Sequence, residues 1–197
     1  SERNFIIGFK NFIFAYDGKA ATIDQFVEKI LENNKEISIE QFKTWYKQNG
    51  TPLVKFKRKW DSKNKILRIS ASQSNKNKKT VYNDLPLIIP INISIFLSSC
   101  EKINKTFILK EKQEEFIIEN LNTEFNKPII TYLRDFSAPI EWETDTTFNE
   151  KLLILELESD YFTIYDTIKG IYKEIICKRI YGKPDLNIEN DLIETIK

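Results

Sequence analysis

The stretch that decides the fold is WYKQNGTPLVKFKRKW, residues 45–60, because the repeat of apolar residues changes within it. Before it, aromatic residues recur at the helical spacings of three and four, and after Pro52 apolar and charged residues alternate. Gly50 suits the left-handed backbone that ends a helix, and Pro52 cannot continue one. We therefore predict that a helical region stops here and a β-strand begins, with Gly50, Thr51 and Pro52 fixing the geometry of the junction.

The region before this junction, residues 1–50, is predicted to form three helices. The first ends at Asp17-Gly18, and its core face consists of Phe5, Phe9, Phe12 and Tyr16. Capping boxes predict where the next two begin, with the pairs Thr22/Gln25 and Ser38/Gln41. Their apolar stripes are Phe26, Val27, Ile30 and Leu31, and then Phe42, Trp45 and Tyr46. A stripe of this kind indicates a protein core rather than a cofactor site.

Residues 51–144 follow a period of two, which predicts short strands joined by turns. The first strand alternates Val54, Phe56, Arg58 and Trp60 with lysines, and Leu67, Ile69 and Ala71 continue as its return strand. Further strands are expected at 89–95, 106–109, 115–119, 128–133 and 140–143, with a surface loop at 76–84. Seven short strands in about ninety residues predict an antiparallel sandwich of immunoglobulin-like type. Pro90 predicts an edge or bulged strand.

From about residue 145 the pattern is helical again. A short helix is expected to contain Leu152, Leu153, Leu155 and Leu157. A longer one has a stripe at Tyr161, Ile164, Tyr165, Ile168, Ile171, Tyr172, Ile175 and Ile176, and a weak helix ends the chain. The predicted fold class is an α+β multidomain fragment: a helical segment at 1–50, a central antiparallel immunoglobulin-like β-sandwich at 51–144, and C-terminal helices at 145–197.

The composition gives no support to two classes of partner, nucleic acid and acidic membrane surfaces. The 197 residues include 30 basic and 29 acidic side chains, a net charge of +1, which favours neither nucleic acid nor an acidic membrane surface. The basic cluster of Lys55, Lys57, Arg58 and Lys59 beside Trp60 could contact phosphates. Alternation places its lysines on the outer face of a strand, however, where such residues usually prevent edge-to-edge pairing.

The chain contains no histidine, which excludes a His-Glu-x-x-His zinc site, a Ser-His-Asp triad and a Cys-His pair. Cys100 and Cys177 are far apart in sequence and are predicted to be free, buried thiols. Glu156, Glu158 and Asp160 could form a carboxylate cluster, but a solvated face with charge at a helix N-terminus is the preferred interpretation. We therefore assign no catalytic, cofactor-binding or metal-binding residue.

Four short strings resemble the alanyl aminopeptidase (aminopeptidase N) family of zinc gluzincins. In chain order they are DGKAAT at 17–22, WYKQNGTP at 45–52, LRDFSAP at 133–139 and SDYF at 159–162. They occur in the order of the family and at similar spacing. Three positions depart from its pattern: Tyr16 stands where histidine is frequent, Asp135 where glycine is common, and Ile164 where an arginine usually follows.

The resemblance implies a parent built from a sheet domain, a thermolysin-like catalytic domain, an immunoglobulin-like domain and a helical C-terminal domain. Residues 1–50 would then end the catalytic domain, 51–144 would be the immunoglobulin-like domain, and 145–197 would begin the C-terminal domain. The zinc ligands and catalytic groups of the family lie upstream of Ser1. The resemblance therefore implies zinc in the parent enzyme, but neither a cofactor nor catalysis in this chain alone.

Two functions remain open at this point. The leading hypothesis is a non-catalytic segment of a zinc-dependent aminopeptidase that hydrolyses N-terminal residues from peptides, with this segment linking the catalytic and C-terminal domains. The alternative is a free-standing immunoglobulin-like binding or scaffolding module. The compartment is open, with the cytoplasm favoured for the parent.

The expected partners are the missing catalytic and C-terminal portions of the parent, with no nucleic acid and no membrane. Apolar side chains at both helical ends are too numerous to bury against a few short helices, so the isolated chain is expected to self-associate. These side chains are Phe5, Phe9, Phe12, Phe26, Ile30, Ile164, Ile168, Ile171 and Ile175.

Overall fold

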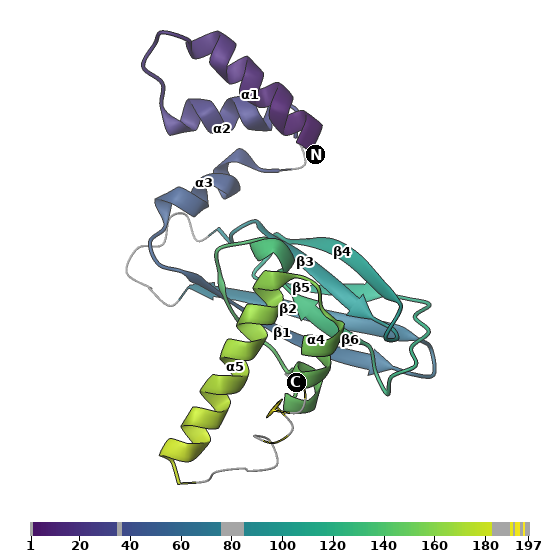
Figure 1. Ribbon diagram of the computed structural model, residues 1–197. Coiled ribbons are helices and arrows are strands. Elements are labelled where there is room, and N and C mark those ends of the chain that lie inside the picture. The colour runs from purple at the N-terminus through teal and green to yellow at the C-terminus, as the bar shows by residue number, and fades with distance from the viewer. Residues whose placement is uncertain are drawn as a thin grey trace. The chain divides into compact units, whose positions relative to one another are not determined.

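The computed structural model describes residues 2–34, 37–75 and 85–182, together with residues 190, 192, 193 and 195. The loop predicted at 76–84 and most of the weak last helix lie outside the described residues. The chain divides into two compact units, which are described separately (Figure 1). The first comprises Ser1–Thr51 and Asn75–Ile88, and the second comprises Pro52–Ser74 and Ile89–Lys197.

The first unit contains the three expected helices, α1 (Glu2–Tyr16), α2 (Ile23–Leu31) and α3 (Ile39–Lys47). The capping box of Thr22 and Gln25 is present at the start of α2. At the start of α3 the Ser38 hydroxyl accepts a hydrogen bond from the backbone N–H of Gln41, which satisfies one of the unpaired amides of the first turn.

The aromatic face predicted for α1 packs on α2. The ring of Phe26 meets Phe12 edge-on, with centroids 5.1 Å apart, and meets Phe9 at 6.4 Å. Gly8 permits this approach, because a Cβ there would lie 2.7 Å from the Ile30 Cα. Contact on one side leaves other α1 side chains exposed, among them Phe14 at 91%.

The junction at Gly50 combines a correct prediction with a wrong one. Gly50 has a φ of +88°, the left-handed conformation expected of it. It does not cap α3, however. The helix ends at Lys47, and the next residue, Gln48, already has an extended backbone with φ −98° and ψ 144°. Gly50 therefore redirects the chain three residues after the helix has ended at Lys47.

The described residues of the second unit form seven strands in two sheets, as the sequence predicts. One sheet has the order β5-β2-β1-β7, formed by β1 (Pro52–Asp61), β2 (Ile66–Asn75), β5 (Gln113–Ile118) and β7 (Glu141–Glu143). The other has the order β4-β3-β6, formed by β3 (Ile89–Phe96), β4 (Lys102–Leu109) and β6 (Ile129–Tyr132). The pairing of β1 with β7 is parallel, with Val54 opposite Trp142. The immunoglobulin-like α+β fold class is thus confirmed.

The alternation in sequence corresponds to the inside and outside of the sandwich. The inward residues of β3 are fully buried: Ile89, Ile91, Ile93 and Ile95. The Phe56 ring of β1 stacks on Tyr132 of β6 with centroids 4.4 Å apart. The alternation disappears at the end of β3, because a helix covers the outer face there, where Phe96, Ile129 and Ile154 form one cluster.

That helix is α4 (Phe148–Leu157), and α5 (Tyr161–Ile180) follows it. The sequence predicts both, with four leucines in the first, and the buried apolar residue of α4 is Ile154. Leu153 and Leu157 pack around it. In α5 the predicted stripe is only partly covered: Ile171 is fully buried, and Tyr161, Tyr165, Tyr172 and Ile176 are exposed.

The prediction that Pro90 marks an edge strand is wrong, because β3 is the central strand of its sheet. Pro90 is tolerated because β6 pairs with β3 only from Ile93 onward. Beside Pro90, the Ser137 hydroxyl makes hydrogen bonds to β3 that a neighbouring strand would otherwise make. It donates to the Pro90 carbonyl at 3.2 Å and accepts from the Asn92 N–H at 3.1 Å.

Ser137 follows a tight 3₁₀ turn, Arg134–Phe136, which contains a concentration of left-handed backbone. Leu133, Asp135 and Phe136 have φ values of +57°, +55° and +49°. A side chain with a Cβ pays a steric penalty in this conformation, on the order of 1 kcal/mol per residue. The glycine common at position 135 in the resembling family would avoid that penalty.

We expect Asp135→Gly to raise the free energy of unfolding by about 0.5–1 kcal/mol, because glycine adopts positive φ without the steric cost. Urea denaturation of the wild-type chain and the variant measures the difference. Asp135→Ala is the matched control, since it removes the same carboxylate but keeps the Cβ. An equal stabilisation by both substitutions would show that charge, and not backbone strain, is the cause.

Candidate functional site

Two buried ion-pair clusters join the sandwich to the helices that follow it. We name the first the Arg58 centre, consisting of Arg58, Asp145, Glu150 and Lys127. We name the second the Glu158 centre, consisting of Glu158, Arg134, Lys102 and Thr131. Both lie inside the second unit, at the two ends of α4.

The Arg58 centre connects β1 with the N-terminus of α4. Arg58 belongs to the inward phase of β1, and its side chain is only 4% exposed. Its Nε lies 3.0 Å from Asp145 Oδ1, and its Nη2 pairs with Glu150 Oε2. Lys127 Nζ approaches the other Glu150 oxygen at 3.0 Å. The Arg58 guanidinium therefore forms ion pairs with two carboxylates, and the Glu150 carboxylate forms ion pairs with two cations.

Glu150 also ends the first turn of α4. With Thr147 it forms a capping box, in which the Thr147 N–H donates to Glu150 Oε2 at 2.8 Å. Burial raises the pKa of this carboxyl, but the hydrogen bonds from Thr147, Arg58 and Lys127 outweigh that effect and lower the pKa to about 2. Glu150 is therefore ionised at any pH near neutrality.

The Glu158 centre connects β6, β4 and the 3₁₀ turn with the segment between α4 and α5. The Glu158 side chain is fully buried. Arg134 Nη2 lies 3.1 Å from Glu158 Oε1, and Thr131 donates to Oε2 at 2.8 Å. The backbone N–H groups of Ser159 and Asp160 donate to Oε1 at 2.8 Å and 3.1 Å. Lys102 Nζ is more distant, at 3.9 Å.

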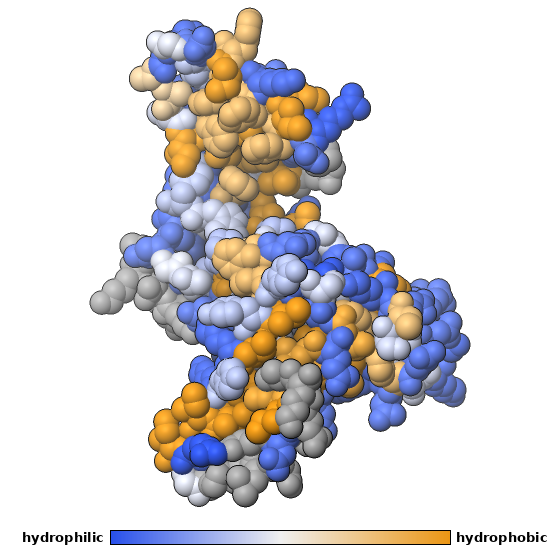
Figure 2. Space-filling view, in the orientation of Figure 1, coloured by the Kyte–Doolittle hydropathy of each residue, from blue (hydrophilic) through white to orange (hydrophobic). Residues whose placement is uncertain are grey.

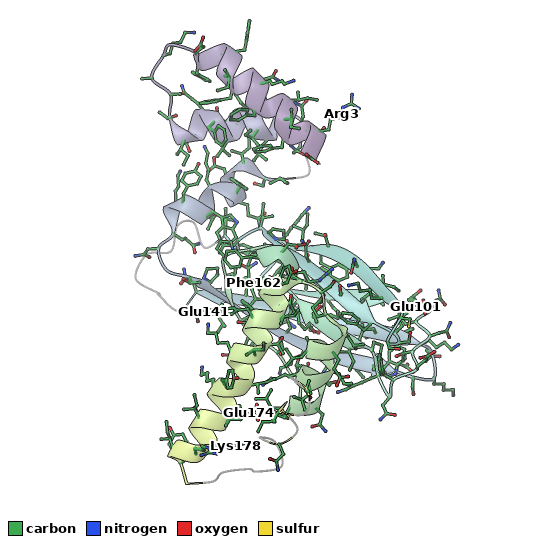
Figure 3. The ribbon with its side chains drawn as sticks, in the orientation of Figure 1. Arg3, Glu101, Glu141, Phe162, Glu174 and Lys178 are labelled. Atoms are coloured by element: carbon green, nitrogen blue, oxygen red, sulfur yellow. The ribbon has the colours of Figure 1, made fainter. Side chains whose placement is uncertain are left out.

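Asp160 fixes the start of α5. It accepts hydrogen bonds from the Thr163 N–H at 2.8 Å and the Thr163 hydroxyl at 2.6 Å, and from the Asp135 N–H at 3.2 Å. Burial raises the pKa of Asp160, but these hydrogen bonds outweigh it and the pKa falls below its usual value. Phe162 lies in the first turn of α5. Its ring contacts Phe136 and Trp142, with ring centroids 5.0 Å and 6.0 Å apart (Figure 3).

Chemically, these centres hold elements in place. The carboxylates of Glu150 and Glu158 are both held in buried ion pairs, Glu150 with Arg58 and Lys127 and Glu158 with Arg134. Removing one member of such a cluster leaves an uncompensated charge in a buried position. The arrangement therefore fixes the direction in which α4 and α5 leave the sandwich.

The structure corrects three interpretations made from the sequence. Of the acidic residues interpreted as a solvated face, only Glu156 is exposed, because Glu158 is buried and Asp160 caps α5 as predicted for a charge at a helix N-terminus. In the basic cluster, Arg58 is buried, and Lys55 pairs with Glu143 at 2.8 Å. Cys100 and Cys177 are free as predicted, but both are exposed rather than buried.

The sequence analysis did not predict that these residues form buried ion pairs, although the sequence contains two signals that point to them. Arg58 occupies the inward phase of an alternating strand, and a charged residue there requires a buried partner. The spacing of Thr147 and Glu150 is that of a capping box, which places a carboxylate at a helix start. The partners in space, such as Arg134 for Glu158, have no signal of this kind.

No group of three or more histidine, cysteine, aspartate or glutamate side chains suited to a metal ion occurs among the described residues. Within the same part of the chain, none of the helices combines the length and the apolar character needed to cross a membrane.

Comparison with known proteins places this geometry in a wider context. Residues 50–145 match a family model described as a domain of unknown function (DUF3458) with an Ig-like fold. The chain is 25% identical over 188 residues to aminopeptidase N of Haemophilus influenzae, covering 91% of this chain and 21% of that protein. It is 24% identical over 179 residues to aminopeptidase N of Escherichia coli, covering 86% and 20%.

Among solved structures, the fold is similar to that of a Legionella pneumophila aminopeptidase A crystallised with aspartic acid, with a TM-score of 0.78 and 24% identity. That match covers 93% of this chain and 20% of the Legionella chain. The chain thus spans about one fifth of the length of the relatives that it matches. Together with the Ig-like match at residues 50–145, these similarities confirm the resemblance of this chain to the aminopeptidase N family.

Proposed function

We propose that this chain is a non-catalytic structural segment of a zinc-dependent aminopeptidase, in which it links a catalytic domain to a C-terminal helical domain. The observation that carries the proposal is the pair of buried ion-pair centres at the two ends of α4. They join the sandwich to the helices that follow.

The residues present do not fit a catalytic zinc ion. Such sites use histidine with carboxylate or thiolate ligands. This chain has no histidine, and its described residues contain no suitable cluster of cysteine, aspartate and glutamate. The proposal therefore assigns zinc and the chemistry of hydrolysis to other residues of a longer protein.

Apolar surface on the helices also supports a role in which they contact further protein. Figure 2 shows apolar side chains over α1 and over the end of α5. On α1 the exposed apolar residues include Phe5 and Phe9, at 49% and 44%, beside Phe14. On α5, Ile176 and Ile180 are exposed. Contiguous apolar surface of this kind usually marks a binding face, so we propose that another copy covers it in the isolated chain.

The purified 197-residue chain tests the proposal in two assays. It should release no product from an alanine anilide and hold no zinc after dialysis. In sedimentation at micromolar concentration it should associate, and Phe14→Lys should shift it toward the monomer while Glu101→Gln, on the sandwich, should not. Turnover with stoichiometric zinc would contradict the non-catalytic role, and a monomeric wild-type chain would contradict the proposed self-association. A His-Glu-x-x-His motif encoded upstream of Ser1 would distinguish the proposal from a free-standing module.

A further inference from the structure

A cleft with a volume of about 100 Å³ lies within the second unit, bordered by residues of β6, β7, α4 and α5. Apolar walls come from Ile130, Trp142 and Ile154, and the remaining border is rich in threonine hydroxyls. Since about 10–15 Å³ of such space holds one water molecule, the cleft admits a group of several heavy atoms.

One carboxylate at this cleft, that of Asp166, is only weakly paired within the described part of the chain. Asp166, on α5, lines the cleft and makes no hydrogen bond or close ion pair with any residue that the structure describes. Burial raises the pKa of Asp166, and the ammonium groups of Lys169 and Lys151 only partly oppose that effect. Lys151 is itself paired with Glu174 at 3.0 Å, on the face of α5 visible in Figure 3.

A second polar residue borders the cleft, and the charges that act on its hydroxyl are those of Arg58, Asp145 and Glu150. Tyr132 borders the cleft, and its hydroxyl is buried without a hydrogen-bond partner among the described residues. Burial raises the pKa of Tyr132, so the hydroxyl keeps its proton.

Gly170 is a third, independent indication. It lies in the interior of α5, where glycine costs about 1 kcal/mol relative to alanine. No backbone approach explains it, because a Cβ at Gly170 would meet nothing within 4 Å. Gly170 also lines the cleft, so the missing side chain leaves the space open.

We propose that this cleft binds one ammonium or guanidinium group, held by the Asp166 carboxylate and set against the Trp142 ring. A cation of this kind supplies hydrogen-bond donors for the carboxylate, which accepts only, and it suits the face of an indole. The threonine hydroxyls that border the cleft can accept its remaining hydrogen bonds. The group can come from a free organic amine or from a lysine or arginine side chain of another polypeptide segment.

NMR titration of the ¹⁵N-labelled full chain at pH 7.5 tests this proposal with two probes, ethylguanidinium chloride and the peptide acetyl-Ala-Arg-Ala-amide. The signals of the Trp142 indole and of the Asp166 and Gly170 amides should shift saturably, with a Kd on the order of 1–10 mM. Binding of the peptide assigns the source to a side chain, and binding of ethylguanidinium alone assigns it to a free cation. Ethylurea, a neutral probe of similar shape, and equal concentrations of sodium chloride should give no such shift.

Three variants make the result specific. Asp166→Asn should weaken binding at least about tenfold, because it removes the charge that pairs with the cation. Gly170→Leu should abolish binding by filling the cleft, and the helix should persist because leucine is the better helix former. Glu156→Gln, an exposed carboxylate of α4 outside the cleft, should leave the Kd unchanged. Absence of saturable shifts with either probe, or full affinity in Asp166→Asn, overturns the proposal.

Discussion

Replacing Glu158 by leucine is expected to lower the free energy of unfolding of the second unit by about 3–5 kcal/mol. The substitution leaves the Arg134 guanidinium, whose side chain is 15% exposed, without its carboxylate. It also removes the acceptor for the Thr131 hydroxyl and for the N–H groups of Ser159 and Asp160. Urea denaturation followed by near-UV circular dichroism measures the loss.

Glu156→Leu is the matched control, because Glu156 lies two residues away, in the last turn of α4, and is exposed. That change should stay within about 0.5 kcal/mol of the wild type. Equal urea midpoints for the two variants would mean that the Glu158 centre contributes nothing beyond an ordinary surface charge. Loss of stability in Glu158→Leu alone would support the role of the Glu158 centre in connecting β6 to the start of α5.

Arg58→Met is expected to cost a similar amount, about 3–5 kcal/mol, because Glu150 then remains buried with Lys127 as its sole cation. The loss should depend on pH. The pKa of Glu150 is about 2 in the folded chain, below its ordinary value of 4.5, so its contribution is complete above about pH 4.5 and is lost as the pH falls toward 2. Without Arg58 the folded pKa should rise, and this part of the acid dependence should shrink.

Urea midpoints of the wild type and Arg58→Met between pH 6 and pH 2.5 test both statements. Lys55→Met is the control, because Lys55 lies on the same strand as Arg58 and its ion pair with Glu143 is exposed. That substitution should change the free energy of unfolding by less than about 1 kcal/mol. A constant difference between wild type and Arg58→Met over the whole pH range would contradict the assigned pKa of Glu150.

Local signals explain why the order of elements could be predicted from the sequence. The change of period at Pro52, the capping pair of Thr22 and Gln25, and the alternating isoleucines of β3 each depend on residues close in sequence. Such features report the local backbone, and they placed three helices, seven strands and the two helices α4 and α5 without knowledge of tertiary contacts.

The Arg58 and Glu158 centres could not be predicted in the same way, because the residues that pair within them are far apart in sequence. Arg58 meets Glu150 across 92 residues, and Thr131 meets Glu158 across 27. The same dependence on tertiary structure explains why Pro90 was misplaced at an edge. Its tolerance depends on where β6 stops pairing and on Ser137, neither of which the sequence around Pro90 reveals.

The parallel pairing of β1 with β7 has a mechanical consequence. The register Leu53↔Glu141 and Lys55↔Glu143 places the first strand of the sandwich beside its last one, running in the same direction. Tension applied between residue 51 and residue 145 pulls these two strands past each other, along their length. Their hydrogen bonds are then loaded together in shear instead of opening one after another. The sandwich is therefore built to carry a pulling force from the segment before it to the segment after it without unravelling from an end.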